Sequence, residues 1–221
     1  MIALVTGGAA SGKSAYAEAL ACGMSPVRTY VATMQNDSAE AAARVEKHRR
    51  QRTDAGFETI EICGSLRHVA PTAHALPKEV QDKQAAGVVL LDDIGNLVSN
   101  AVFATEGTMT NTDDSTMANT DDVLARLIRE FDDLAAQYAH VVVVGNEVGA
   151  SGQQFDAATE AWVRVVGNLC RAIAAQSDIV VEVVAGQPNV VKGTAPARPQ
   201  KVDSALLRQQ AATLEMEGVV V

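Results

Sequence analysis

A glycine-rich segment near the amino end constrains the fold of this chain more than any other feature. Residues 7–14 have the spacing G-x-x-x-x-G-K-S, after an apolar run at 2–6 and before a helical pattern that begins near Lys13 and continues to Leu20. In such a loop the backbone N–H groups and the helix N-terminus face phosphate oxygens, the lysine reaches the outer phosphates and the serine hydroxyl can ligate Mg²⁺. A glycine-rich turn without a ligand is the alternative, but the complete spacing and both flanks favour nucleotide binding. The predicted phosphate-binding residues are Gly7, Gly8, Ala9, Ala10, Ser11, Gly12, Lys13 and Ser14.

Short apolar runs alternate with helical patterns along the rest of the chain. Strands are expected at 2–6, 27–33, 88–91, 141–144 and 179–184, and the clearest amphipathic helices at 122–138 and 157–175. Parallel neighbouring strands need a crossover connection, usually a helix. The alternation therefore predicts an α/β fold with a parallel sheet covered by helices.

Two segments interrupt this alternation. Residues 105–120 are polar and contain a short internal repeat, which is typical of a surface insertion. Residues 194–221 begin with a segment rich in Pro, Ala, Lys and Arg and continue into 202–217, which could form one short helix. We predict one domain over 1–193, with an insertion near 105–120, followed by a linker and tail over 194–221.

Composition narrows the class of partners. Hydrophobic residues make up 48% of the chain and charged residues 20%, which is ordinary globular usage. The 18 Lys and Arg against 27 Asp and Glu give a formal charge of −9, which disfavours nucleic acid and anionic membranes, so an anionic ligand must be held locally. Three scattered cysteines, no membrane-spanning apolar run and no cationic leader lead us to expect a cytoplasmic protein.

A second acidic group for a bound Mg²⁺ ion is expected at the end of an apolar strand. The run at 88–91 ends in Asp92 and Asp93, and we assign Asp92 to the metal together with Ser14. Aspartate is also a favoured helix N-cap, and a helix is expected at 94–103. The two aspartates can therefore divide the metal and capping roles between them.

A basic cluster at 44–52 stands out in this acidic chain, because five of its nine residues are Lys or Arg. Arginine side chains suit phosphate oxygens, and neighbouring cations lower the pKa of a histidine, which leaves His48 with a nitrogen lone pair able to attack phosphorus. The alternative is a solvated helix C-terminus, where cations complement the helix dipole. Spacing alone leaves both interpretations open.

Taken together, these motifs resemble a known family, the bifunctional adenosylcobinamide kinase and adenosylcobinamide-phosphate guanylyltransferase of cobalamin biosynthesis. The resemblance covers residues 1 to about 193. Its matching segments are the glycine loop with its strand, 30–33 (Tyr-Val-Ala-Thr), Arg44 with His48 and Arg49, 59–61 (Thr-Ile-Glu), 90–92 with Asn100, 146–149 (Asn-Glu-Val-Gly), and 185–188 with Lys192.

The resemblance implies a RecA-like P-loop NTPase sheet with helices on both faces, a homotrimer, and two reactions. The first transfers the γ-phosphoryl group of ATP or GTP to adenosylcobinamide, and the second transfers GMP from GTP to the resulting phosphate. It implies a guanylyl-histidine intermediate at His48. Lys13 is the other catalytic residue that we expect, because the lysine of the glycine loop reaches the outer phosphates. The further nucleotide-binding positions that the resemblance implies are Ala32, Thr33, Met34, Glu61 and Asp92. Beside His48, we expect the basic cluster to bind phosphate as well, through Arg49, Arg50, Gln51 and Arg52, because cations there neutralise charge as pyrophosphate leaves.

The sequence departs from the family pattern in places. Glu160, Arg164 and Cys170 stand where the family has an Arg, an Asp and an Asn on one helix, Phe57 replaces a Trp, and nothing after 193 matches. Two other functions are compatible with the chain. One is another small P-loop kinase whose basic cluster only clamps phosphate, and the other is a nucleotide-binding module without catalysis.

Overall fold

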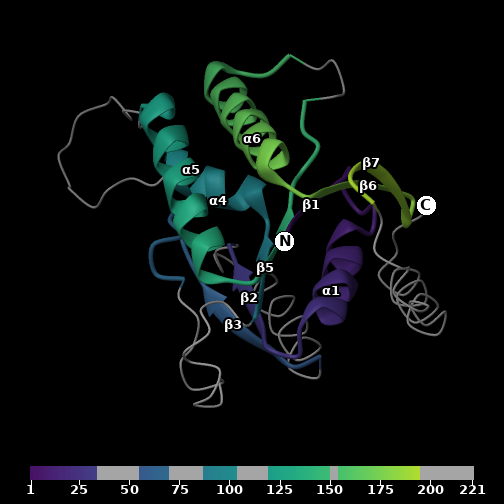
Figure 1. Ribbon diagram of the computed structural model, residues 1–221. Helices are drawn as coiled ribbons and strands as arrows, with labels where there is room; N and C mark the ends of the chain where they lie inside the picture. Colours follow the sequence, from purple (N-terminus) through teal and green to yellow (C-terminus); the bar gives the residue numbers. More distant parts are fainter. Residues whose placement is uncertain (34–54, 70–86, 104–118, 150–153, 195–221) are drawn as a thin grey trace, which may run out of the picture.

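A mostly parallel sheet forms the centre of the molecule (Figure 1). The computed structural model describes residues 1–33, 55–69, 87–103, 119–149 and 154–194. Within these residues the sheet has seven strands in the order β3-β2-β4-β5-β1-β6-β7, and β7 alone among them is antiparallel to its neighbour. The strands are β1 (Ile2–Thr6), β2 (Arg28–Ala32), β3 (Phe57–Glu61), β4 (Val88–Asp92), β5 (His140–Val144), β6 (Ile179–Val184) and β7 (Gln187–Lys192).

Helices cover both faces of the sheet (Figure 1). On one face α1 (Lys13–Met24) packs through Ala17, Leu20 and Ala21, two of them small enough for close approach to the strands. The described helices on the other face are α4 (Ile94–Phe103), α5 (Thr120–Gln137) and α6 (Ala157–Gln176). The predicted α/β fold, with a mostly parallel sheet between helices, is therefore confirmed.

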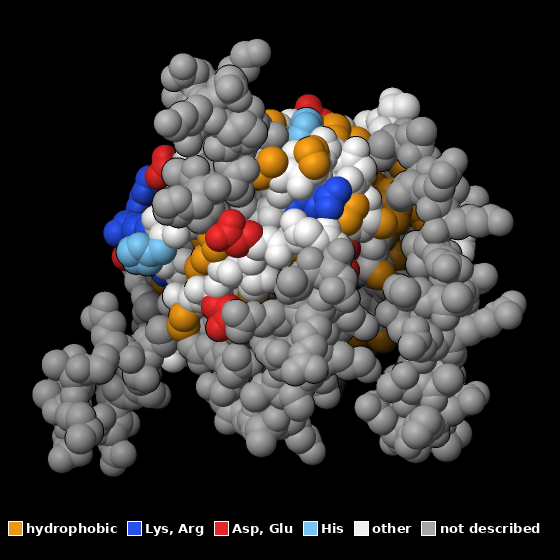
Figure 2. All heavy atoms as spheres, turned by 90° about the horizontal axis from the view of Figure 1, so that it is seen from below, with side chains coloured by type: hydrophobic (Ala, Val, Ile, Leu, Met, Phe, Trp, Pro, Cys, Tyr) orange, Lys and Arg blue, Asp and Glu red, His pale blue; other side chains and the backbone are white. Residues whose placement is uncertain are grey.

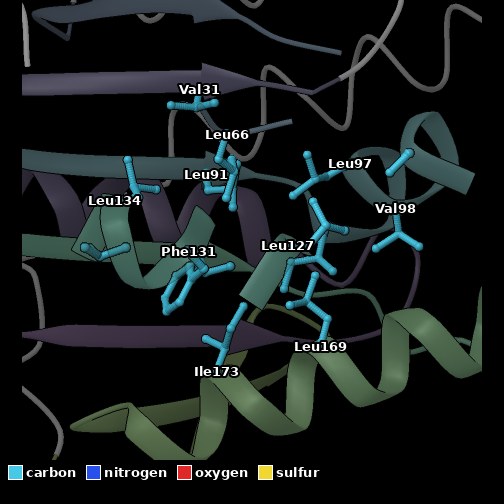
Figure 3. Packing of buried hydrophobic residues seen from close by; sticks show 14 of the residues in the cluster. Val31, Leu66, Leu91, Leu97, Val98, Leu127, Phe131, Leu134, Leu169 and Ile173 are labelled. Carbon is cyan, nitrogen blue, oxygen red and sulfur yellow. The ribbon is translucent and has the colours of Figure 1, made fainter. Parts of the chain in front are cut away.

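The larger core lies between the sheet and these three helices. Figure 3 shows side chains from the strands, α4, α5 and α6 converging on one region, with the Phe131 ring of α5 near Ile173 of α6. The central strands β4 and β5 are buried on both faces, so they read as continuous apolar runs. This burial explains why these strands were recognisable from sequence.

Two strands were missed from the sequence, and both lie at edges of the sheet. In β3 only Phe57 is buried, so no continuous apolar run marks the strand. Strand β7 is largely exposed and contains Pro188, a residue that sheets accept mainly at their edges. Edge strands that are partly or largely exposed lack the continuous apolar run from which the other strands are predicted.

The expected helices agree with the structure to within a few residues. The expectation at 94–103 is met in full, and the helix of the glycine loop extends to Met24. Helix α5 begins at Thr120 rather than 122, because the Asn119 side chain accepts a hydrogen bond from the Asp121 N–H (3.1 Å) and caps it. The last residues of the expected insertion thus belong to the start of α5, and the expected helix at 202–217 lies outside the described residues.

A buried carboxylate holds the segment after β3 against α5. Glu130 is only 4% exposed and accepts hydrogen bonds from the Leu66 N–H (2.8 Å) and the Ser65 hydroxyl (3.1 Å). Arg67 and Arg126 lie 3.1 and 3.2 Å from the same carboxylate. Because a buried charge without such partners would be strongly destabilising, this cluster fixes the path of the chain that leaves β3.

Candidate functional site

The glycine loop joins the carboxyl end of β1 to the first turn of α1. Gly7 and Gly12 have φ angles of 154° and 91°, and Ala10 also has a positive φ, of 54°. A Cβ atom at Gly7 would stand 2.5 Å from the Val183 carbonyl oxygen and 2.6 Å from the Ser11 hydroxyl oxygen. Glycine is therefore required at position 7 both by its conformation and by the close approach of β6.

Hydrogen bonds from two neighbouring segments fix the shape of this loop. The Glu147 N–H, just after β5, donates to the Gly7 carbonyl (3.2 Å), and the Gly186 N–H, in the β6–β7 turn, donates to the Ser11 carbonyl (2.8 Å). The Lys13 ammonium group lies over the loop and donates to the Gly8 carbonyl (3.0 Å). The positive charge of the lysine is thus held against the loop backbone.

Asp92 comes close to the glycine loop although its strand is not adjacent to β1. Strand β5 lies between β1 and β4 in the sheet. Helix α1 packs across the face formed by these strands and brings the Ser14 hydroxyl to 3.4 Å from Asp92 Oδ1. The two residues assigned to Mg²⁺ from the sequence are therefore side by side in the structure.

The neighbouring aspartate has a different position. Asp93 Oδ1 accepts a hydrogen bond from the Asn96 N–H (2.8 Å), so Asp93 is the N-cap of α4. The Thr33 hydroxyl lies 2.9 Å from the Asp93 carbonyl oxygen and 3.1 Å from that of Asp92, and it accepts from the Asp93 N–H (2.9 Å). The structure thus separates the two aspartates, with Asp93 bound to the backbone of α4 and Asp92 turned toward α1.

Other expected site residues lie at the same end of the sheet, where the parallel strands β2, β3 and β4 finish. Ala32 at the end of β2 is in register with Asp92 on one side and with Glu61 on the other. Thr33 is fully buried, whereas Glu61 is exposed at the end of β3. Since ligands of open α/β sheets bind outside the carboxyl ends of the strands, these residues lie along the expected crevice.

The other expected site residues, His48 and its basic neighbours among them, cannot be located on the sheet. Met34, His48, Arg49, Arg50, Gln51 and Arg52 all lie outside the described residues. Their roles remain predictions from the sequence.

Sequence reasoning gave no role to several polar residues that the structure brings to this edge. The Tyr30 hydroxyl donates to Asp92 Oδ2 (2.6 Å), and the Asn100 side-chain amide donates to the Thr33 carbonyl (2.7 Å). Asn146 carries a buried side-chain oxygen with no hydrogen-bond partner among the described residues. Tyr30, Asn100 and Asn146 occur in the motifs that suggested the family, but their contacts depend on the order of strands in the sheet.

The oxygen atoms at this edge fit Mg²⁺ better than a softer metal. Mg²⁺ is usually bound by one or two carboxylates together with substrate phosphates and water, and a hydroxyl and a carboxylate are what Ser14 and Asp92 supply. Among the described residues, no three His, Cys, Asp or Glu side chains gather as they would around zinc. The residues present therefore fit a magnesium-bound nucleotide.

Cys170 and Lys192 have structural roles, the first in core packing and the second in helix capping. Cys170 faces the core beside Gly145, and burial, aided by the charge of Asp93, raises the pKa of its thiol to about 11. None of the three cysteines forms a disulfide. The Lys192 ammonium group donates to the carbonyls of Ala174 (3.0 Å) and Ala175 (2.9 Å), where it complements the C-terminal dipole of α6.

On the face shown in Figure 2, the described basic side chains form small separate groups among acidic and apolar ones. The described part of that face therefore presents no broad cationic surface. Within the same described residues, we find no helix with the length and apolar character needed to span a bilayer.

The parallel sheet and the glycine loop, with Ser14 and Asp92 beside it, define a P-loop nucleotide-binding protein. Residues 3–191 match the family described as cobinamide kinase / cobinamide phosphate guanyltransferase (CobU). The chain therefore belongs to this family of transferases.

Three relatives are similar over nearly their whole length. The chain is 34% identical to the bifunctional adenosylcobalamin biosynthesis protein CobU of Salmonella typhimurium over 189 residues, and 32% identical to CobU of Escherichia coli over 186 residues. Each alignment covers 84% of this chain and 97% of the relative. The protein CobP of Pseudomonas aeruginosa is 27% identical over 194 residues, covering 86% of this chain and 96% of its own.

Among solved structures, the chain resembles an ATPase of a type III secretion system with a TM-score of 0.47 and 12% identity. That match covers 82% of this chain and 50% of the ATPase.

Proposed function

We propose that this protein phosphorylates adenosylcobinamide with ATP or GTP and then transfers GMP from GTP to adenosylcobinamide phosphate, giving adenosylcobinamide-GDP. The family match supports the pair of reactions. The observation in the structure that carries the proposal is the Ser14–Asp92 pair beside the glycine loop, because it provides a place for a magnesium-bound triphosphate.

In the kinase reaction, the aminopropanol hydroxyl of the corrinoid attacks the γ-phosphorus and the nucleoside diphosphate leaves. The loop N–H groups and the Lys13 ammonium group hold the β- and γ-phosphates and stabilise the charge that develops on them. Ser14 and Asp92 would hold Mg²⁺, which neutralises phosphate charge when bound. Ala32, Thr33, Met34 and Glu61 are proposed to contact the nucleotide.

In the guanylyl transfer, a ring nitrogen of His48 attacks the α-phosphorus of GTP. A nitrogen–phosphorus bond forms, the bond to the β-phosphate oxygen breaks, and pyrophosphate leaves with the electron pair. An oxygen of adenosylcobinamide phosphate then attacks the same phosphorus and releases the histidine. Arg49, Arg50, Gln51 and Arg52 are proposed to bind the phosphates, because cationic and polar donors favour the departing charge.

Labelling with GTP that carries the isotope in its α-phosphate tests the covalent step. The protein should retain acid-labile, base-stable label, and His48→Ala should lose the label while still binding GTP. His68→Ala is the matched control, because His68 is an exposed histidine of the described residues with no proposed role. Label that persists in His48→Ala would exclude this nucleophile, and phosphoryl transfer from ATP without any adduct would indicate a simple P-loop kinase.

We propose further that the protein works in the cytoplasm as a homotrimer. Sedimentation of the purified full chain checks the second point, with a mass three times that of the 23.1 kDa protomer expected.

A further inference from the structure

The carboxylate of Asp92 is held from two sides by residues of different elements. Tyr30 on β2 donates its hydroxyl hydrogen to Oδ2 over 2.6 Å, and Ser14 on α1 lies 3.4 Å from Oδ1. A short hydrogen bond to an ionised acceptor is stronger than one between neutral groups. Of these two contacts, the one with Tyr30 is the closer, and the other carboxylate oxygen of Asp92 is turned toward Ser14 at the start of α1.

Register and strand period explain this geometry. Tyr30 pairs with Leu90 and Ala32 pairs with Asp92, so Tyr30 lies two residues from Asp92 along the sheet. Side chains alternate between faces, and Tyr30, Leu90 and Asp92 all point to the face covered by α1. Diagonal neighbours on one face lie within reach of a long aromatic side chain, which brings the phenol oxygen to the carboxylate.

The tyrosine ring itself has little freedom to move. Tyr30 is 2% exposed, and its ring meets that of Phe57 edge to face, with centroids 6.2 Å apart and an interplanar angle of 86°. Packing fixes the ring and the ring fixes the hydroxyl group. The hydrogen bond thereby ties Asp92 Oδ2 to a residue that is fixed in the core.

From this arrangement we propose that Tyr30 is a positioning residue for magnesium, which holds the Asp92 carboxylate so that Oδ1 faces the metal beside Ser14. The inference rests on the proposed magnesium site. Groups that hydrogen-bond to a metal ligand typically change metal affinity 10- to 100-fold when removed, because the ligand then loses its fixed orientation. Tyr30 does not itself contact nucleotide or metal in this role.

The test compares three variants of the full chain. Binding of Mn²⁺, as a paramagnetic substitute for Mg²⁺, is titrated by electron paramagnetic resonance in the presence of guanosine 5′-(β,γ-imido)triphosphate. Tyr30→Phe should weaken Mn²⁺ binding at least about 10-fold, while binding of the analogue in EDTA stays near that of the wild type. The matched control is Tyr138→Phe, which removes another buried tyrosine hydroxyl, one that lies 3.5 Å from the Thr29 hydroxyl oxygen. Its Mn²⁺ affinity should equal that of the wild type.

Asp92→Asn separates failure of this inference from failure of the site. If Asp92→Asn retains full Mn²⁺ affinity, the proposed metal site is wrong. If Asp92→Asn loses affinity while Tyr30→Phe and Tyr138→Phe both keep it, the site stands and the role of Tyr30 is excluded. A purely structural tyrosine would lower the melting temperature without changing Mn²⁺ affinity.

A second measurement does not depend on the folding of Tyr30→Phe. The chain has three tyrosines, so the variant Tyr16→Phe/Tyr138→Phe, grown with 3-fluorotyrosine, carries fluorine only at Tyr30. Its ¹⁹F resonance should shift when Mg²⁺ is added to the analogue complex, and this shift should disappear when Asp92→Asn is introduced as well. A resonance that does not respond to Mg²⁺ would overturn the proposal.

Discussion

The hydroxyl oxygen of Ser14 lies 3.4 Å from the carboxylate oxygen Oδ1 of Asp92, although 78 positions separate the two residues in the chain and β5 lies between β4, which ends in Asp92, and β1, which leads into the glycine loop. Helix α1 makes this contact possible, because its first turn lies on the sheet face toward which Asp92 points. The relationship links the phosphate loop to the far side of β5.

Comparing Lys13→Ala with Lys192→Ala should distinguish the effect of removing the positive charge at the loop from the general effect of removing a lysine. Lys13→Ala removes the positive charge over the loop, so GTP should bind more weakly and turnover should fall about 100-fold. Lys192→Ala is the control, because Lys192 caps α6 and its loss should cost only about 0.5 kcal/mol of unfolding free energy. Isothermal titration and steady-state kinetics check both variants. Unchanged GTP affinity and turnover in Lys13→Ala would contradict the assigned phosphate site.

Adjacent glycines of the loop should differ sharply in their tolerance of a methyl group. Gly7→Ala places Cβ 2.5 Å from the Val183 carbonyl oxygen, so the backbone must shift and stability should fall by about 2 kcal/mol. Gly8→Ala meets nothing within 4 Å and should change stability by less than about 0.5 kcal/mol. Urea denaturation of the two variants measures the difference. Equal destabilisation of the two variants would contradict the close approach of Gly7 to the Val183 carbonyl oxygen of β6.

Asp93 should behave as a helix cap. Asp93→Ala should lower the unfolding free energy by about 1 kcal/mol, because the Asn96 N–H loses its acceptor. Asp93→Asn keeps a capping oxygen and should be close to the wild type. Thermal unfolding measures the cap, and Mn²⁺ titration measures the metal. Loss of metal affinity in Asp93→Asn as large as that in Asp92→Asn would contradict the separation of roles.

Stability should fall as the pH is lowered below about 6.5, in part through His140. Burial, and then the positive Met1 amino group, lowers the pKa of this imidazole below its ordinary value of 6.5. Between that value and the lower folded pKa, the unfolded chain binds the proton more readily, so protonation favours unfolding. Above pH 6.5 the histidine is neutral in both states and has no such effect.

The variant His140→Gln isolates this contribution, because the other histidines remain in both proteins. Urea unfolding at pH 7.5 and 5.5 should give a smaller loss of stability for the variant than for the wild type. Identical losses would exclude His140 as a source of the pH dependence.

The strand prediction succeeded where the tertiary environment imposes a simple pattern. Strands β1 and β6 have the bounds that the sequence predicts, because the buried positions of a central strand all require apolar side chains. Strand β7 was missed because an exposed edge strand has few such requirements, and Pro188 argues against a strand anywhere except at an edge.

The candidate site shows the same contrast between features that a local pattern predicts and features that depend on tertiary contacts. The class of chemistry could be predicted from the local motif, since G-x-x-x-x-G-K-S needs only local spacing to form its loop and place Lys13 and Ser14 at the start of a helix. By contrast, the folded arrangement was needed to see that Asp92 faces Ser14 while Asp93 caps α4, and that Tyr30 reaches Asp92 from a neighbouring strand. These contacts depend on strand order, register and side-chain alternation together, and the apolar pattern along the chain does not show which strands become neighbours.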